Sequence, residues 1–247
     1  GNPANGEITG KGSFYYISTP TNTLVSQGAR WRYRDAASAA PTDWNLMAFA
    51  DGTWPEGPAQ LGFSGGEEGD EATPIADNNQ ITSYFRHGFN VTDPTAFASL
   101  SLSLLRDDGG VVYLNGKEVF RSPNLPAYPA TISYGTTTVA PNGENTIDTA
   151  MIASTNLQAG TNLVAVEIHQ QSATSSDVSF NFELKGQPVP SVNLANFGET
   201  LLLYWFDTAY ILQEAPTLDG PWTTAASASP WAVQPATDQK FYRLRKL

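Results

Sequence analysis

The densest group of chemically capable side chains lies in residues 106–121, RDDGGVVYLNGKEVFR, with two adjacent carboxylates, a glycine pair and an Asn-Gly-Lys step. A phosphate-binding P-loop needs four residues between its first glycine and the Gly-Lys pair, and then Ser or Thr. Here five residues separate Gly110 from Gly116, and Glu118 follows Lys117. An EF-hand is excluded as well, because acidic residues do not alternate along the stretch.

A structural interpretation accounts for every position of the same stretch. Asn115-Gly116 supplies the two positive-φ residues of a type I′ turn, which predicts a hairpin between VVYL and KEVF. Asp107 and Asp108 can cap the preceding bend through the backbone, and the glycine pair that follows relieves its strain. We therefore expect this segment to be architecture, with only its loop tips close to a ligand.

His87 and His169 are the only histidines, so a metal site with three histidine ligands is excluded. A Ser-His-Asp triad would have to use one of the two, and no G-x-S-x-G nucleophile elbow occurs. By strand alternation His169 is expected on a solvent-facing side together with Glu167. There it is a candidate ligand contact rather than a catalytic base.

Glycoside hydrolysis by paired carboxylates needs the two groups roughly 5–10 Å apart across a substrate. The adjacent acids Asp107/Asp108 and Glu67/Glu68 are sequence neighbours, whose side chains rarely face each other across a groove. We expect no enzyme activity, and a glycoside hydrolase remains an alternative.

The segment GGEEGDEAT, residues 65–73, is the strongest candidate for a metal site. It places four carboxylates within five residues on a glycine-rich loop, where they repel one another unless water or a cation lies between them. Calcium accepts six to eight oxygen ligands in flexible geometry. Glu67, Asp70 and Glu71 are therefore candidate ligands of a structural calcium ion, with a solvated loop as the alternative.

Composition limits the classes of partner. With 13 basic and 24 acidic residues the net charge is −11, which repels nucleic acid and anionic membranes and suits a neutral polymer or a cation better. Cysteine is absent, which excludes disulfides and thiolate chemistry. The longest strongly apolar stretch, LLLYWF at residues 201–206, is too short to insert across a membrane.

A surface rich in Thr, Ser, Asn, Gly and Pro favours a secreted or cell-surface protein. A chain that starts at Gly1 is expected to be a processed or excised product.

Period-two alternation of apolar and polar residues dominates the chain. It is clear in residues 98–105, 162–170 and 177–186, which predict strands with one buried and one solvent-facing side. Short turn signals between them favour a β-sandwich or jelly roll over βαβ units. A short helical turn is expected in residues 93–99, where Asp93 can cap it and a proline follows.

A domain boundary is expected near residues 185–192, KGQPVPSV, where two prolines follow a completed strand. Beyond it, four segments read as strands in under 60 residues. We therefore predict a sandwich over residues 1–188 and a small β-domain over residues 189–247.

Two blocks of the first domain resemble the galactose-binding-like β-sandwich modules of large secreted bacterial proteins. They are LLRDDGGVVYLNGKEVFR and residues 157–184, LQAGTNLVAVEIHQQSATSSDVSFNFEL; WRYRD, FADGTWPEGPAQLGF and TSYFRHGFNV precede them in the same order. The resemblance covers residues 14–185 and implies a binding or accessory role without catalysis. Residues 199–245 are similar to the short β-modules that end many exported proteins, which implies a sorting or spacer role.

Sugar recognition needs flat aromatic faces and forked donors and acceptors. A cleft is expected beside the loop HQQSATSSD, residues 169–177. The alternative is that the large aromatics, Trp54 among them, belong to the core. The candidate ligand-binding residues are Trp54, Tyr84, Arg86, Arg106, Arg121, Asn124, Tyr128, His169, Gln170 and Asp177.

The sequence thus predicts an all-β, jelly-roll or galactose-binding-like sandwich that acts as a non-catalytic module binding a polysaccharide or oligosaccharide outside the cell. Its other partners are expected to be further domains of a larger secreted protein, or copies of itself. The second hypothesis is a structural or adhesive subunit of a surface layer or filament. It rests on residues 201–206 and 240–247, which are expected to be exposed strand edges open to pairing.

Overall fold

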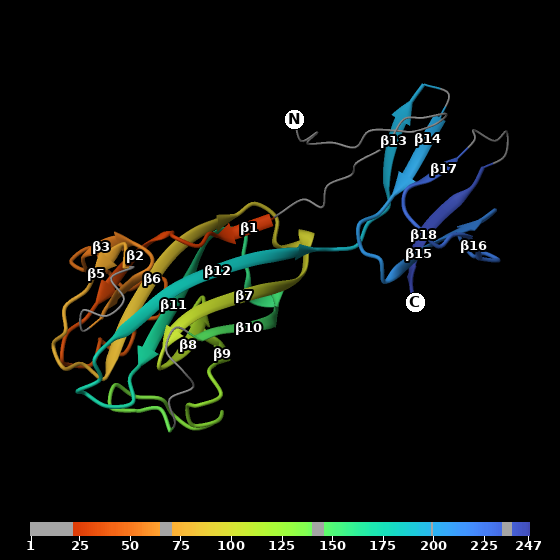
Figure 1. Ribbon diagram of the computed structural model, residues 1–247. Coiled ribbons are helices and arrows are strands. Elements are labelled where there is room, and N and C mark those ends of the chain that lie inside the picture. The colour runs from red at the N-terminus through yellow and green to blue at the C-terminus, as the bar shows by residue number, and fades with distance from the viewer. Residues whose placement is uncertain (1–21, 65–70, 140–145, 199, 234–238) are drawn as a thin grey trace. The chain divides into compact units, whose positions relative to one another are not determined.

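The computed structural model describes residues 22–64, 71–139, 146–198, 200–233 and 239–247. The described residues fall into two compact units, a first unit of Asn22–Pro188 and a second unit that begins at Val189 (Figure 1). Each unit consists of β-strands, and the described helices are two short 3-10 turns in the first unit, η1 (Pro94–Ala96) and η2 (Ser154–Asn156). None of the described helices is long and apolar enough to cross a membrane.

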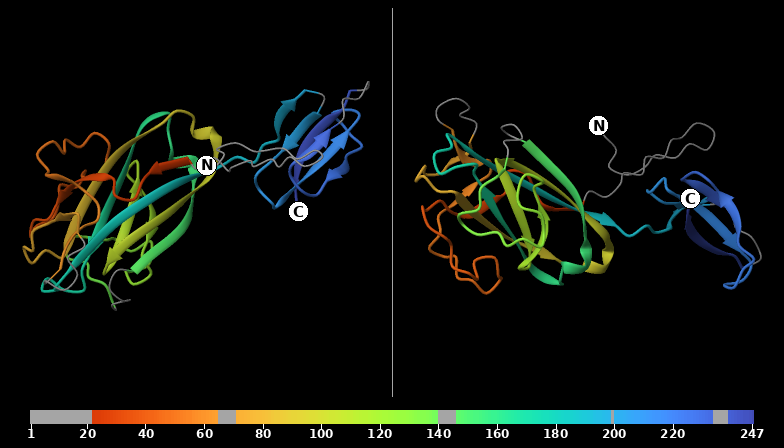
Figure 2. Two further views of the ribbon diagram at one scale, coloured as in Figure 1. Left: turned by 45° about the horizontal axis from the view of Figure 1, so that its top comes forward. Right: turned by 90° about the horizontal axis from the view of Figure 1, so that it is seen from below.

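The first unit is a sandwich of two sheets (Figures 1 and 2). In the first sheet the order is β10-β7-β12-β4-β5, and β1 also pairs with β12; in the second it is β3-β2-β6-β11-β8-β9. The strands of the first sheet are β1 (Asn22–Val25), β4 (Leu61–Phe63), β5 (Thr73–Pro74), β7 (Phe97–Asp107), β10 (Thr146–Ala153) and β12 (Val178–Pro188). Those of the second are β2 (Arg30–Arg34), β3 (Glu56–Pro58), β6 (Thr82–Val91), β8 (Gly109–Leu114), β9 (Lys117–Arg121) and β11 (Gly160–His169).

The main core lies between the two sheets and is built by the predicted alternation. β7 and β12 direct alternate leucines and phenylalanines inward, and β6, β8 and β11 do the same from the opposite sheet. Phe85 and Phe180 stack across the interface with ring centroids 4.0 Å apart, and the edge of Trp31 contacts Phe180 at 4.9 Å. The strands expected at residues 98–105, 162–170 and 177–186 and the all-β sandwich are therefore confirmed.

A second, smaller core lies on the outer face of the second sheet. Trp44 and Trp54 come from the loop that joins β2 to β3, and they pack on Tyr84, Leu163 and Ala165 of β6 and β11. This cover explains why β11 is buried on both faces over most of its length. Glu167 and His169 of β11, which alternation assigns to solvent, are therefore buried.

The turn predictions are also confirmed. Asn115 and Gly116 have φ values of 52° and 83°, and they join β8 to β9 as an antiparallel hairpin. Asp93 caps η1 by accepting a hydrogen bond from the backbone N–H of Thr95 at 2.9 Å.

The second unit contains two three-stranded sheets, β13-β14-β17 and β16-β15-β18. Leu203, Trp205 and Leu212 form its core. Besides the four expected segments, the structure shows β13 and β17. Its strands are β13 (Asn193–Phe197), β14 (Thr200–Tyr204), β15 (Tyr210–Ala215), β16 (Thr223–Ala226), β17 (Trp231–Val233) and β18 (Phe241–Lys246). β14 lies between two partners, so the expectation of an exposed edge at residues 201–206 is wrong, whereas β18 does lie at the edge of its sheet.

Candidate functional site

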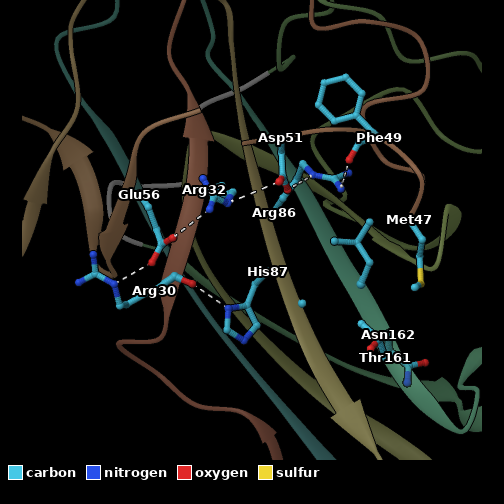
Figure 3. Close-up of a pocket in the computed structure, with 12 residues that line it drawn as sticks. Arg30, Arg32, Met47, Phe49, Asp51, Glu56, Arg86, His87, Thr161 and Asn162 are labelled. Carbon is cyan, nitrogen blue, oxygen red and sulfur yellow. Dashed lines mark hydrogen bonds and ion pairs between the residues drawn. The ribbon is translucent and has the colours of Figure 1, made fainter. Parts of the chain in front are cut away.

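A pocket of about 460 Å³ lies on the outer face of the second sheet, next to the loop that carries Trp44 and Trp54. Its floor and one side come from β2, β3, β6 and the start of β11, and the other side comes from the Met47–Asp51 part of the loop. Figure 3 shows the arrangement, with Phe49 and Met47 opposite Arg30 and Glu56.

Strand alternation explains why charged groups gather on this floor. Trp31 and Phe85 point into the main core, so their neighbours Arg32 and Arg86 point to the outer face. The two arginines lie directly opposite each other on β2 and β6. Like charges in such a pair are destabilising, and this pair needs a counter-ion between the two side chains.

Asp51 supplies that counter-ion. One carboxylate oxygen lies 2.8 Å from Nε of Arg86, and the other lies 3.4 Å from Nε of Arg32. Glu56 continues the chain of charges, at 3.6 Å from Arg32 and 2.8 Å from Nε of Arg30. Five charged side chains thus alternate in sign across the pocket, as the dashed lines in Figure 3 indicate.

Arg86 holds the loop in place rather than offering itself to a ligand. Its guanidinium donates to the backbone carbonyls of Trp44, Leu46 and Phe49 as well as to Asp51. The side chain is only 3% exposed, and its Cζ lies 5.1 Å from the ring centre of Phe49. Arg86 is therefore a positioning residue for the wall of the pocket.

Two features of the pocket remain available to a ligand, Arg30 and Gly88. Nε of Arg30 donates to Glu56, and its two Nη atoms make no hydrogen bond within the part of the chain that the structure describes. His87 supports Arg30 from the core side of the sheet: its ring packs on Trp31, and its Nδ1 donates to the carbonyl oxygen of Arg30 at 2.7 Å. Gly88 leaves the floor bare, because a Cβ there would have one neighbour within 4 Å, the carbonyl oxygen of Asn162 at 3.8 Å.

Three predicted ligand residues hold loops together. Arg106 is buried, pairs with Asp148 at 3.0 Å and donates to the carbonyl of Asp108. Arg121 pairs with Glu118 at 2.7 Å and donates to the carbonyls of Pro126 and Ala130. The buried amide of Asn124 donates to the same Asp108 carbonyl at 2.9 Å.

The predicted aromatic residues separate into buried and exposed ones. Trp54 and Tyr84 are buried in the smaller core. For Trp54 this confirms the alternative prediction, that the large aromatic residues belong to the core and do not contact a ligand. Burial and the nearby Glu167 carboxylate raise the pKa of Tyr84 to about 12. Tyr128 is 78% exposed on the loop after β9 and does not line the pocket.

His169 is fully buried, so the expectation that it faces solvent is wrong. Residues 134–138 cover it: its Nδ1 lies 2.8 Å from the carbonyl oxygen of Thr136, and its Nε2 lies 3.4 Å from a Glu167 oxygen. Gln170 is buried beside it, and Asp177 lies half-buried in the loop before β12. Of the ten predicted ligand residues, only Arg86 lines the pocket.

A second group of acids lies where β7 turns into β8. Asp107 is 3% exposed, and its Oδ2 has no hydrogen-bond partner among the described residues. Burial, followed by the charges of Asp177 and Asp108, raises the pKa of the Asp107 carboxyl to about 8. Asp108 Oδ2 accepts a hydrogen bond from the backbone N–H of Gln171 at 2.7 Å, so this aspartate holds the loop after β11 instead of its own bend.

Two of the three predicted calcium ligands, Glu67 and Asp70, lie outside the described residues. The third, Glu71, is half-buried, and its Oε1 has no hydrogen-bond partner in the described chain. Within residues 22–64, 71–139 and the later described ranges, no group of three or more acidic or histidine side chains could hold a metal ion. A calcium ion at residues 65–73 stays a prediction.

The sequence does contain a signal for this pocket. Residues 30–34, RWRYR, place Arg30 and Arg32 on one face of a strand, and TSYFRHGFNV places Arg86 and Gly88 on one face of another. Asp51 and Glu56 follow from the loop between these segments. The pairing of β2 with β6, which brings the two arginine rows together, could not be deduced from alternation.

No protein-family model matches this chain, and no curated protein is similar to it in sequence. The fold resembles parts of solved glycoside hydrolases. A β-glucuronidase from an uncultured Clostridium is 11% identical over 93% of this chain and 43% of its own, with a TM-score of 0.45. A family 2 glycosyl hydrolase from Bacteroides cellulosilyticus is 10% identical over 89% and 31%, also at 0.45. The chain thus spans less than half of these enzymes, and TM-scores this low carry no information on function.

Proposed function

We propose that the first unit is a non-catalytic carbohydrate-binding module of a larger extracellular protein, and that it binds its sugar in the pocket between β2, β6 and the Met47–Asp51 loop. The observation that carries the proposal is a pocket in which free donors, charged acceptors and an apolar wall face one space. Sugar hydroxyls need donors and acceptors together, and the C–H face of a sugar ring needs an apolar surface.

The size of the pocket agrees with one or two sugar residues. Ligand pockets in proteins are typically about 300–1,000 Å³, and this pocket is about 460 Å³. The carboxylates of Asp51 and Glu56 are both paired with arginines, so they are suited to accept hydrogen bonds from hydroxyls. Phe49 and Met47 supply the apolar wall.

The experiment is calorimetric titration of neutral and acidic oligosaccharides into the full chain, with a substitution that fills the pocket. Gly88→Gln is expected to lower affinity at least tenfold, because its side chain extends from the bare floor into the pocket. Gly88→Ala is the matched control: its methyl group meets its neighbour at 3.8 Å, and affinity should change by less than about threefold. Product analysis after long incubation should show no cleavage of the oligosaccharide.

Binding that survives Gly88→Gln unchanged would place the sugar elsewhere on the molecule. Absence of binding across the whole set, in a folded protein, would overturn the proposed function. Release of shorter sugars would favour a glycoside hydrolase in its place.

A second candidate function, self-assembly into a surface layer or filament, has one observation in its favour. β10 is an edge strand of the first sheet, and it exposes 59% of Ile147 and 62% of Met151. Unpaired edges with apolar side chains invite another strand. Light scattering measures the molar mass in solution and tests this candidate. A monomer at every protein concentration would exclude self-assembly, and a mass that grows with concentration would support it.

A further inference from the structure

The pocket differs in charge from the protein that carries it. Among its lining residues are three arginines, Arg30, Arg32 and Arg86, and two acids, Asp51 and Glu56, which leaves a net charge of +1. The whole chain carries −11. Hydrogen-bonded contacts to charged groups act at short range, whereas the field of the distant acids is screened over about 8 Å at physiological ionic strength. A single anionic group can therefore be held here although the protein as a whole repels polyanions.

Arg30 provides the free end of the charge network. Its side chain is 62% exposed, and Glu56 accepts only its Nε–H. Figure 3 shows its terminal nitrogens at the end of the alternating network. A guanidinium with two unpaired N–H edges matches the two oxygens of a carboxylate in a planar, two-bond contact, which a lysine cannot form.

His87 fixes the backbone from which Arg30 extends. Its Nδ1 donates to the Arg30 carbonyl at 2.7 Å, and its ring packs against Trp31 with centroids 5.2 Å apart. The imidazole thus anchors the backbone of Arg30 to the core.

Gly88 lies beside these groups and gives a ligand access to the sheet. Glycine in the interior of a strand loses packing and backbone entropy, and it often marks a point where a ligand approaches the backbone. Gly88 is exposed and no side chain fills the space above it, whereas at the buried glycines of the same sandwich, Gly57, Gly62 and Gly110 among them, a Cβ would collide with a neighbour below 3 Å.

We propose that the pocket selects a sugar residue that carries a carboxylate, a uronic acid unit, with its carboxylate on the two Nη atoms of Arg30 and its ring over Gly88. This inference rests on the proposed function, since it names the class of sugar that the same pocket binds. Asp51 and Glu56 then accept hydrogen bonds from ring hydroxyls, and Phe49 and Met47 cover the opposite face.

The test compares each acidic oligosaccharide with its own neutral form. Trimers to hexamers of 1,4-linked galacturonate, glucuronate and mannuronate are titrated into the full chain before and after chemical reduction of their carboxyls to alcohols. Hydrogen bonds to charged groups contribute about 1.5–3 kcal/mol, which corresponds to roughly 10- to 150-fold in affinity. We expect at least tenfold tighter binding of one acidic form than of its reduced partner.

Three variants assign the difference to Arg30. Arg30→Gln is expected to lower the affinity for the acidic form at least tenfold more than the affinity for the reduced form, so that the two forms bind alike. Arg30→Lys, which keeps the charge and loses the planar fork, is expected to fall between the two. Arg245→Gln makes the same charge change on an exposed position of β18 and should leave both affinities unchanged.

The outcomes separate the two proposals. Equal binding of acidic and reduced forms, abolished in both by Gly88→Gln, would keep the proposed function and overturn this inference. Absence of binding for both forms would overturn the proposed function and the inference with it. A third outcome is that a sulfated oligosaccharide without carboxylates binds as tightly as the acidic form, and that Arg30→Lys binds as tightly as the wild type. The site would then recognise negative charge alone, and the assignment of a carboxylate would be overturned.

Discussion

Arg32 and Arg86 face each other across β2 and β6, and the carboxylate of Asp51 joins both guanidiniums. One loop residue thus neutralises a like-charge pair on the sheet and ties the wall of the pocket to its floor. This bridge adds to the hydrogen bonds by which Arg86 holds the backbone carbonyls of the same loop.

The first prediction concerns that bridge. Asp51→Asn keeps the shape of the side chain but leaves Arg86, only 3% exposed, beside Arg32 without a counter-ion. Removing one partner of a buried ion pair typically costs about 3–5 kcal/mol. We expect a loss in the free energy of unfolding of about 3 kcal/mol, measured by denaturant titration. Glu56→Gln is the control: its partner Arg30 is exposed, so the loss should stay below about 1 kcal/mol. Equal losses in both variants would contradict the role given to Asp51.

The second prediction concerns the buried acid on β11. Tyr113 donates its hydroxyl hydrogen to Glu167 Oε1 at 2.7 Å, and burial followed by the Glu167 charge raises the pKa of Tyr113. Tyr113→Phe removes the donor and leaves a buried carboxylate oxygen unsatisfied, which costs about 1–3 kcal/mol. Tyr134→Phe serves as control, because among the described residues its hydroxyl makes only a long contact of 3.4 Å with the N–H of Ile81. Thermal unfolding should show a clearly larger drop for Tyr113→Phe, and the reverse order would refute this account.

The third prediction concerns the hairpin turn. Gly116 has a φ of +83°, and a Cβ there would lie 2.6 Å from a methyl carbon of Leu46 in the loop that walls the pocket. Gly116→Ala should therefore destabilise through both backbone strain, about 1–2 kcal/mol, and this collision. Gly135→Ala is the matched control, since a Cβ there has no neighbour within 4 Å and φ is not positive. Similar unfolding midpoints for the two variants would show that neither the positive φ nor the contact with Leu46 makes Gly116 necessary.

The features that sequence predicted best are those set by neighbours along the chain. Alternation identified β7, β11 and β12, and the Asn-Gly step identified the turn between β8 and β9. Both signals depend on local geometry, which the residue types themselves carry.

The candidate site could not be derived in this way. His169 was expected in solvent because alternation assigns it to the outer face, and it does lie there; but residues 134–138 cover that face. Arg106 and Arg121 have the residue type of ligand contacts, and their actual role is to bind backbone carbonyls of loops. Which loop covers which strand is a long-range property, so a single sequence identifies polar groups more readily than their exposure.

The last prediction concerns pH and the Asp107 carboxyl, whose pKa is raised to about 8 by burial and by the charges of Asp177 and Asp108. In the unfolded chain this group has its ordinary pKa of 3.8, so between the two values the folded state binds a proton that the unfolded state has lost. The free energy of unfolding should therefore fall as pH rises from about 4 to 8, with a slope from this group of at most about 1.4 kcal/mol per pH unit. Asp107→Asn keeps the size and hydrogen-bonding capacity of the side chain without the titration. It should flatten this slope and be more stable than the wild type at pH 8.

Asp93→Asn is the control for the pH dependence of stability. The Thr95 hydrogen bonds lower the pKa of Asp93, so its contribution is lost as pH falls below its ordinary value, and the variant should retain the wild-type slope between pH 4 and 8. Denaturant titrations at unit pH steps measure all three proteins, and an unchanged slope in Asp107→Asn would show that this carboxyl is ionised in the folded protein.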